Sequence, residues 1–240
     1  MSGHSHAKTV MATKMANAAK KGKIFSKMGR LITIAAKDGG DPITNSKLKS
    51  AIDQAKSFDM PKENIERAIK KGTGELAGES LEEVVFEGFG PGGIAIIAEG
   101  ITDNTNRAFT EVKVILNQNN GKMAGKGAVK WMFERKGDIA INNEEKTINK
   151  EEFELAAIDA GADDIQWEEG EVYVYTKPED LEKVKKLLEE KNYKIESVSL
   201  GFVAKEKVEI SEKEKEQAQR LFDALDENDA VNNIYSNLKT

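Results

Sequence analysis

The sequence predicts an α+β protein of three domains, an N-terminal helical bundle followed by two α/β sandwiches, one of which is inserted in the other. Apolar residues recur at helical spacing from residue 7 to residue 75, and from Leu81 the spacing changes to that of strands. Residues 138–198 hold a complete β-α-β-β-α-β pattern, which leaves a helix and a strand to complete the sheet begun at Leu81. We therefore expect domains at 1–78, at 79–135 together with 205–240, and at 136–204.

The helix expected over residues 23–37 has an apolar stripe and, opposite it, a ridge of positive charges. The stripe consists of Ile24, Met28, Leu31, Ile32 and Ala35. At about 100° per residue the cations fall within an arc of roughly 80°; they are Lys23, Lys27, Arg30 and Lys37. No acidic residue precedes Asp38, so nothing in this helix neutralises the ridge. The pattern favours a surface that binds a polyanion, and a solvated helix face is the alternative.

The segment before this helix is basic on every side. Three of its lysines point to different sides of any helix that residues 7–21 could form, and they are Lys8, Lys14 and Lys20; Lys21 follows directly. A helix with charged side chains on all sides packs poorly against protein. We therefore expect this arm to become ordered when it binds a partner. Gly22 is expected to separate the arm from the helix that follows.

Two further helices complete the expected bundle. A turn signal at residues 38–42 precedes a helix whose inner stripe is Leu48, Ala51, Ile52 and Ala55. Pro61 suits the first turn of the next helix, which Gly72 and Gly74 end. Lys62 lies near the tip between these two helices.

The middle domain is expected to begin with a hairpin of residues 84–87 and 94–99. The glycine-rich run between them, residues 87–93, could also be a phosphate-binding loop, but such loops lead from a strand into a helix, and Pro91 removes a backbone donor. Its other predicted elements are a helix over 103–116, a loop over 117–127, a strand near 129–134, a helix over 211–225 and a strand near 231–235. Arg107, in the first turn of the first of these helices, is expected to have an internal acidic partner.

The inserted domain follows the ferredoxin-like order. The predicted strands are 138–141, 164–167, 171–176 and 194–198, and the predicted helices are 151–160 and 178–190. The same order occurs in RNA-recognition domains, and Tyr173 and Tyr175 share one strand face. The first strand offers no aromatic residue, however, and glutamates surround the tyrosines. We therefore interpret this domain as an interaction or spacing module.

Composition excludes several classes of chemistry. The chain has no cysteine and only two histidines, His4 and His6, so we expect no catalytic, metal or cofactor site and no enzyme activity. No apolar run is long enough to span a membrane and no signal peptide is apparent, so we expect a cytoplasmic protein. The first thirty residues carry seven positive charges and no negative ones, whereas the whole chain has a net charge of −6. Such asymmetry predicts a basic N-terminus that contacts a polyanion.

Short motifs along the whole chain resemble those of the YebC family, which includes the mitochondrial translational activator of cytochrome c oxidase. They are Gly3-His4-Ser5, Gly22-Lys23-Ile24-Phe25, Gly39-Gly40-Asp41-Pro42, Met60-Pro61-Lys62, Glu66-Arg67-Ala68-Ile69-Lys70, Glu87-Gly88-Phe89-Gly90-Pro91-Gly92-Gly93, Thr102-Asp103-Asn104, Asn106-Arg107 and Tyr235-Ser236-Asn237. The resemblance implies three domains and a role in gene expression without catalysis. It also implies nucleic-acid binding, either as a ribosome-associated translation factor or as a DNA-binding transcriptional regulator. Many members have Lys-Trp after Gly-His-Ser, where this chain has His6-Ala7.

We favour ribosomal RNA as the partner, with duplex DNA as the alternative and a ligand-sensing α/β module as a lesser one. The residues expected to contact phosphates are Lys8, Lys14, Lys20, Lys21, Lys23, Lys27, Arg30, Lys37 and, more weakly, Lys62. The acidic domains could face a protein partner, and the asymmetric chain is expected to be a monomer.

Overall fold

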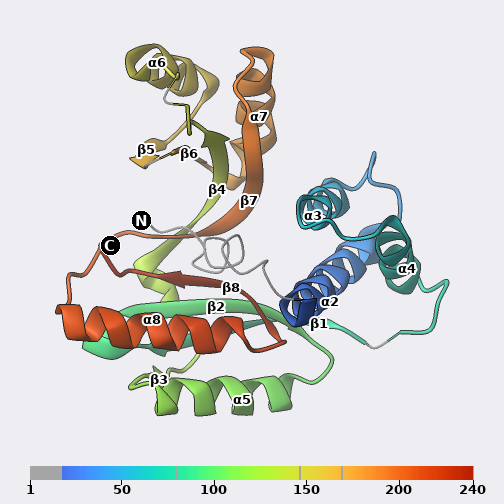
Figure 1. The fold of residues 1–240 in the computed structure, drawn as a ribbon, viewed down its shortest axis with the longest axis vertical. Helices are drawn as coiled ribbons and strands as arrows, with labels where there is room; N and C mark the ends of the chain where they lie inside the picture. The colour runs from blue at the N-terminus through green and yellow to red at the C-terminus, as the bar shows by residue number, and fades with distance from the viewer. Residues whose placement is uncertain (1–17, 79, 146, 169, 240) are drawn as a thin grey trace.

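The computed structural model describes residues 18–78, 80–145, 147–168 and 170–239 (Figure 1). Its N-terminal part is a bundle of α2 (Ala18–Ala35), α3 (Ser46–Ser57) and α4 (Lys62–Gly72). The predicted inner stripe of α2 is confirmed, since Ile24, Met28, Ile32 and Ala35 are buried against the other two helices. Asn45 joins α2 to α3, because its side chain donates to Ala35 O and accepts from Leu48 N.

The expected helix break at Gly22 is wrong. Helix α2 runs through Gly22 without interruption. A glycine inside a helix costs only about 1 kcal/mol relative to alanine, and burial of Ile24 and Met28 in the bundle offsets this cost.

The first sheet combines strands from two distant parts of the chain, as predicted. Its elements are β1 (Glu82–Phe89), β2 (Ala95–Thr102), α5 (Thr105–Gln118), β3 (Lys122–Met123), α8 (Glu212–Asp226) and β8 (Val231–Ser236). The strands lie in the antiparallel order β3-β1-β2-β8, with α5 and α8 packed on one face (Figure 1). The glycine-rich run between β1 and β2 is a hairpin turn with a 3-10 turn at Pro91–Gly93, which confirms the hairpin interpretation.

The second sheet has the predicted ferredoxin-like connection. Its elements are β4 (Phe133–Asn142), α6 (Lys150–Ala160), β5 (Asp164–Glu168), β6 (Glu171–Thr176), α7 (Leu181–Glu190) and β7 (Ile195–Ala204). The antiparallel strand order is β5-β6-β4-β7. The first sheet also has four antiparallel strands, but its connection differs: β1 leads by a hairpin directly into β2, whereas α6 separates β4 from β5. The whole is an α+β protein with two four-stranded sheets.

The two sheets meet through β4 and β7, which corrects one predicted element. A separate strand at 129–134 does not exist: a 3-10 turn covers Lys130–Met132, and β4 then runs unbroken from Phe133. Strand β4 is long because it pairs with β7 from Phe133 to Ile141. Phe133 and Phe202 pack on the face of the first sheet that α5 and α8 leave uncovered.

We expect Gly100→Ala to destabilise the first sheet. Strand β2 bulges at this residue against β8, and a Cβ at Gly100 would lie 2.0 Å from Ala230 O. Relieving such an overlap typically costs about 1–3 kcal/mol, which urea unfolding would measure. Gly22→Ala is the matched control, because no atom beyond the adjacent residues and the nearby backbone of its own helix lies within 4 Å of the added Cβ, and it should raise the free energy of unfolding by up to about 1 kcal/mol. Equal effects of the two substitutions would contradict the packing described here.

Candidate nucleic-acid interface

The structure describes only part of the predicted basic arm. Lys8 and Lys14 lie outside the described residues, as do His4 and His6, and of Lys20 only the backbone, within α2, is described. The side chains of Lys21 and Lys62 are exposed, the latter 3.6 Å from Glu66 Oε1 in the same helix. Whether these lysines contact phosphates stays a prediction.

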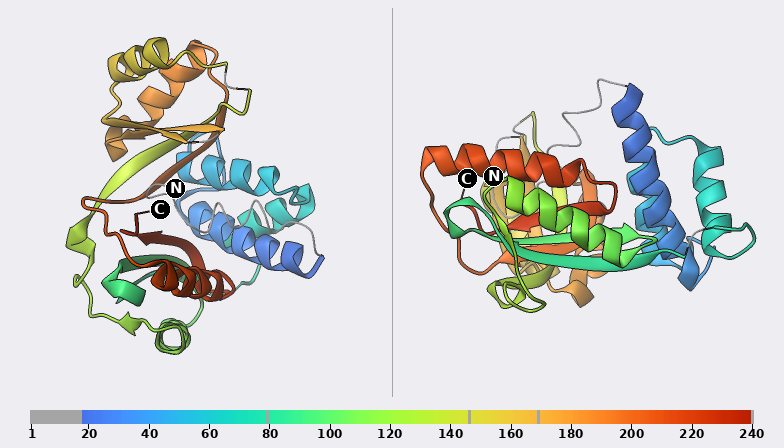
Figure 2. Two further views of the ribbon diagram at one scale, coloured as in Figure 1. Left: turned by 60° about the vertical axis from the view of Figure 1, so that its left-hand side comes forward. Right: turned by 90° about the horizontal axis from the view of Figure 1, so that it is seen from below.

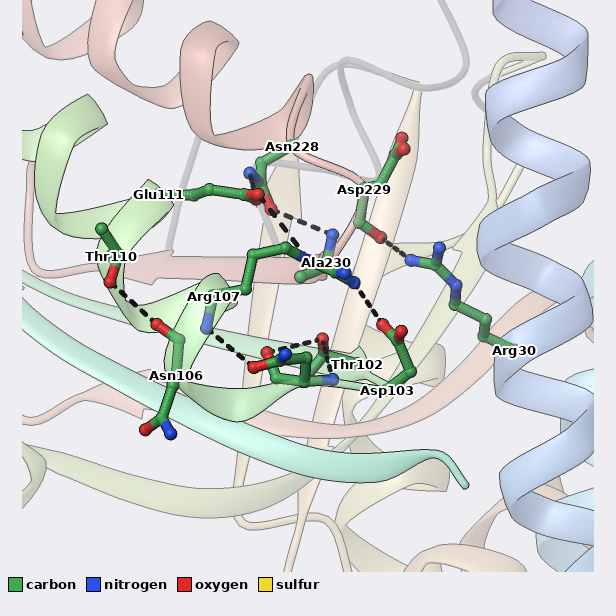
Figure 3. A network of polar contacts seen from close by, with 11 residues as sticks. Arg30, Thr102, Asp103, Asn106, Arg107, Thr110, Glu111, Asn228, Asp229 and Ala230 are labelled. Atoms are coloured by element: carbon green, nitrogen blue, oxygen red, sulfur yellow. Dashed lines mark hydrogen bonds and ion pairs between the residues drawn. The ribbon is translucent and has the colours of Figure 1, made fainter. Parts of the chain in front are cut away.

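The basic ridge of α2 makes internal contacts that the sequence did not predict. Lys27 is buried and Arg30 is half-buried, whereas Lys23 and Lys37 are exposed. Lys23 Nζ lies 3.3 Å from Glu227 O, Lys27 Nζ bonds to Asp226, Arg30 Nη1 lies 2.6 Å from Asp229 O, and Lys37 Nζ lies 2.6 Å from Leu81 O. Three of the four thus meet the end of α8 and the turn that leads to β8. Figure 3 shows the contact between Arg30 and Asp229. The last carbonyls of a helix lack intrahelical donors and carry the negative end of its dipole, so they attract cations. The ridge is therefore not wholly free, because it joins α2 to the first sheet, and whether its exposed members Lys23 and Lys37 contact phosphates stays a prediction.

Lys27 is the most buried member of this contact. Its side chain is 5% exposed, and its Nζ lies 3.3 Å from Asp226 Oδ1. Burial lowers the pKa of Lys27, and the attraction of Asp226 and Asp229 only partly offsets this effect. A phosphate group cannot reach an ammonium group held in this way.

Arg107 has internal partners, as expected. Its guanidinium pairs with Asp103 and lies 3.9 Å from Glu111 Oε1, while its backbone N–H donates to Asn104, the N-cap of α5 (Figure 3). Asn228 in turn donates to Glu111 Oε2 at 2.9 Å. The turn that receives Arg30 is therefore also joined to α5.

Glu87, in the glycine-rich motif, organises a loop and not a phosphate site. Its buried carboxylate accepts the backbone N–H groups of Gly127, Val129 and Lys130 at 2.6–2.9 Å. Burial alone would raise the pKa of Glu87, but these three donors outweigh it and hold the pKa below its usual value.

The exposed cations that remain in the bundle gather on one side of α4. Arg67, Lys70 and Lys71 are exposed at helical spacing i, i+3 and i+4, and no described carboxylate lies within 4.0 Å of their charged groups. We call these three residues the α4 basic face. Helix α2 lies between α4 and the first sheet (Figures 1 and 2).

A groove of about 370 Å³ borders the α4 basic face. Arg67 and Lys71 line it from α4, and Phe25, Ser26 and Arg30 line it from α2. Its lining includes no acidic residue. Cations, hydroxyl and amide groups and one aromatic ring can together hold a phosphate and an adjoining base.

Sequence reasoning missed the α4 basic face, although the signal was present. The inner stripe of α4, Ile65 and Ala68, fixes which side is buried. On that phase Arg67, Lys70 and Lys71 share the outer side, one turn after Glu63 and Glu66, which lie on the same side.

The second sheet offers an acidic environment. Tyr173 donates to Glu171, and burial together with the charges of Glu171 and Glu168 raises its pKa. These charges would repel a phosphate backbone, in keeping with the interpretation that this sheet does not read bases. Among the described residues no group of three His, Asp or Glu could hold a metal ion, and no helix there is long and apolar enough to cross a membrane.

Comparison with known proteins assigns the family. Residues 5–75 match the model of the TACO1/YebC protein N-terminal domain, and residues 81–238 match that of the TACO1/YebC second and third domain. A probable transcriptional regulatory protein of Caldanaerobacter subterraneus subsp. tengcongensis is 44% identical over 240 residues, which are 100% of this chain and 98% of that protein. A probable transcriptional regulatory protein of Thermotoga maritima is also 44% identical over 240 residues, with coverage of 100% and 94%. The crystal structure of a conserved hypothetical protein from Aquifex aeolicus has a TM-score of 0.86 and 40% identity, covering 95% of this chain and 93% of that one. This chain therefore belongs to the TACO1/YebC family.

Proposed function

We propose that this protein is a non-enzymatic gene-expression factor that docks on ribosomal RNA through its N-terminal bundle. The observation that carries the proposal is the α4 basic face, three aligned cations without described acidic partners beside a groove without acidic lining. Residues 18–78 contain thirteen Lys and Arg against seven Asp and Glu, although the chain as a whole is acidic. Phosphate contacts from such a surface provide binding that depends on charge more than on sequence.

The basic arm would extend the same surface. Lys8, Lys14, Lys20 and Lys21 precede α2 or lie in its first turns, and they have no acidic neighbours in the sequence. Lys62 begins α4 and would add a weaker contact. Lys27 is buried and does not belong to this surface, whereas the exposed Lys23 and Lys37 would add to it and Arg30 lines the groove.

The arrangement supports a division into three functional parts. The bundle would bind RNA, the first sheet would hold the bundle through the α2 ridge, and the acidic second sheet would face solvent or a basic protein partner. The family models, which separate an N-terminal domain from a second and a third, support this division. We propose that the protein acts as a cytoplasmic monomer.

Binding to duplex DNA is the second candidate, and the names of the bacterial relatives favour it. An asymmetric chain offers no two-fold pair of recognition helices for two DNA half-sites, which favours folded RNA. Binding to ribosomes, to protein-free ribosomal RNA and to duplex DNA at matched salt separates the two candidates. We expect ribosomes to bind most tightly, and stronger, sequence-dependent binding to duplex DNA would overturn the RNA proposal.

Removing the α4 basic face should weaken RNA binding. For the triple variant R67A/K70A/K71A we expect affinity for ribosomal RNA to fall roughly 50- to 150-fold at about 0.15 M salt, since each lost phosphate contact removes about 0.7–0.9 from the logarithmic salt dependence. The three side chains are exposed, so the circular dichroism spectrum and the thermal midpoint should stay close to those of the unmodified protein. Undiminished RNA affinity in a folded variant would exclude this face as the binding site.

A further inference from the structure

A second feature of the surface is a tryptophan held in the open by an ordered loop. Trp131 is 68% exposed and lies next to the end of the segment of residues 124–132 that follows β3, which we call the Trp131 loop. Its indole Nε1 donates to Ala128 O at 3.0 Å within the same loop, which fixes the ring relative to the loop backbone. The ring is thus both accessible and oriented.

Glu87 holds the Trp131 loop in place through hydrogen bonds. Three backbone N–H groups of the loop donate to this one buried carboxylate, and Ala124 N donates to Glu87 O at 2.8 Å. Val129 is fully buried in the cluster that joins the two sheets. Because the loop is already ordered before binding, it loses little conformational entropy when a ligand binds.

The charge of this region is opposite to that of the chain. Residues 122–132 contain Lys122, Lys126 and Lys130 and no Asp or Glu, whereas the whole protein has a net charge of −6. No described carboxylate lies within 4.0 Å of the three ammonium groups. Lys130 Nζ lies 5.9 Å from the centre of the Phe202 ring in β7.

We propose that the Trp131 loop binds an unpaired nucleotide of RNA, with the base stacked on Trp131 and flanking phosphates on Lys126 and Lys130. An exposed aromatic ring beside lysines is the combination that single-stranded nucleic acid requires, because every base has a face that can stack. A protein partner would call for a wider apolar surface than one ring among lysines and glycines. This inference rests on the proposed RNA-binding function and adds a second point of contact to it.

The position of the loop suits a large folded RNA. Strand β3, which leads into the loop, lies toward the end of the first sheet away from α2 (Figure 1). The α4 basic face and the Trp131 loop are therefore separate contacts, and one can be removed without the other.

The test is fluorescence and binding with a single-stranded adenine dodecamer of RNA as the probe. The chain has two tryptophans, so the background W167F leaves Trp131 as the sole indole emitter. We expect the dodecamer to quench this emission and W131A to lower its affinity about 5- to 100-fold, while W131F retains most of it. A blunt RNA duplex of the same length exposes only its terminal bases, so W131A should bind it nearly as well as the unmodified protein.

Each outcome has a defined meaning. Unchanged dodecamer affinity in W131A, or no quenching in W167F, overturns the stacking site even if R67A/K70A/K71A still loses ribosomal RNA binding. The stacking site is also overturned if crosslinking attaches a protein to the unmodified chain but not to W131A while RNA binding stays intact. That result assigns the loop to a protein partner. Failure of the unmodified protein to bind any RNA overturns the proposed function itself. W131F controls for folding, since it keeps an aromatic ring at the same exposed position.

Discussion

Glu87→Ala is expected to lower the free energy of unfolding by about 3–5 kcal/mol, because hydrogen bonds to a charged group contribute about 1.5–3 kcal/mol each and their loss leaves buried donors unpaired. The carboxylate accepts from Gly127, Val129 and Lys130, and Val129 N is buried. Glu87→Gln should cost less, because its single amide oxygen can still accept from two of the three donors while its NH₂ group faces the third. Urea unfolding followed by circular dichroism measures both variants.

Glu83→Ala is the matched control, since Glu83 is exposed on the same strand and should change the free energy of unfolding by no more than about 0.5 kcal/mol. The effect of Glu87→Ala should also depend on pH. The pKa of Glu87 is lower in the folded than in the unfolded protein, so its stabilisation is complete above pH 4.5 and is lost as the pH falls through the folded value. A stability difference between the unmodified protein and Glu87→Ala that grows as the pH falls would contradict this assignment.

Lys27→Glu should detach the bundle from the first sheet or destabilise the protein by about 3–5 kcal/mol, the usual cost of an uncompensated buried charge. The substitution would place two carboxylates together where Lys27 and Asp226 are now 5% and 10% exposed. Urea unfolding measures the cost, and small-angle scattering detects a larger radius of gyration if the bundle swings away.

Lys49→Glu makes the same change of charge on the exposed surface of α3. It should leave the free energy of unfolding and the radius of gyration nearly unchanged. Adding Asp226→Lys to Lys27→Glu restores opposite charges and should recover part of the lost stability. The contact described here is wrong if Lys27→Glu behaves as Lys49→Glu does.

The buried ammonium of Lys27 also predicts a pH dependence. Its pKa is lower in the folded protein than the ordinary 10.5, so the folded state loses this proton first as the pH rises. Between the folded value and 10.5 the unfolded state binds more protons, and stability should therefore rise with pH in that interval. In Lys27→Met the free energy of unfolding should not rise in this interval. Urea unfolding measured at several alkaline pH values would show the difference.

Periodicity predicted most of the fold. The elements of the second sheet, the hairpin of β1 and β2, and the return of α8 and β8 to the first sheet all follow from alternation and helical spacing. The inner stripe of α2 was also predicted correctly, because Ile24, Met28 and Ile32 share one phase. These features depend on local sequence or on the pairing of adjacent elements.

The predictions that failed depend on contacts between distant parts of the chain. The α2 ridge shows like charges on one face, but the sequence does not show that the end of α8, some two hundred residues later, lies against Lys23, Lys27 and Arg30. Strand β4 looked like two strands because Arg135-Lys136-Gly137 interrupts its apolar pattern, whereas pairing with β7 carries it through. A basic ridge can thus hold a fold together instead of binding a ligand, and only the packed structure distinguishes the two roles.

The central claim is that the α4 basic face contacts RNA phosphates while the α2 ridge holds the bundle in place. The most direct measurement is the slope of log affinity for ribosomal RNA against log salt, compared between R67A/K70A/K71A and the control K183A/K185A/K186A, which removes the same charge from α7. We predict that the α4 variant flattens the slope by about two to three units and the α7 variant leaves it unchanged. Equal slopes in the two variants would contradict the claim.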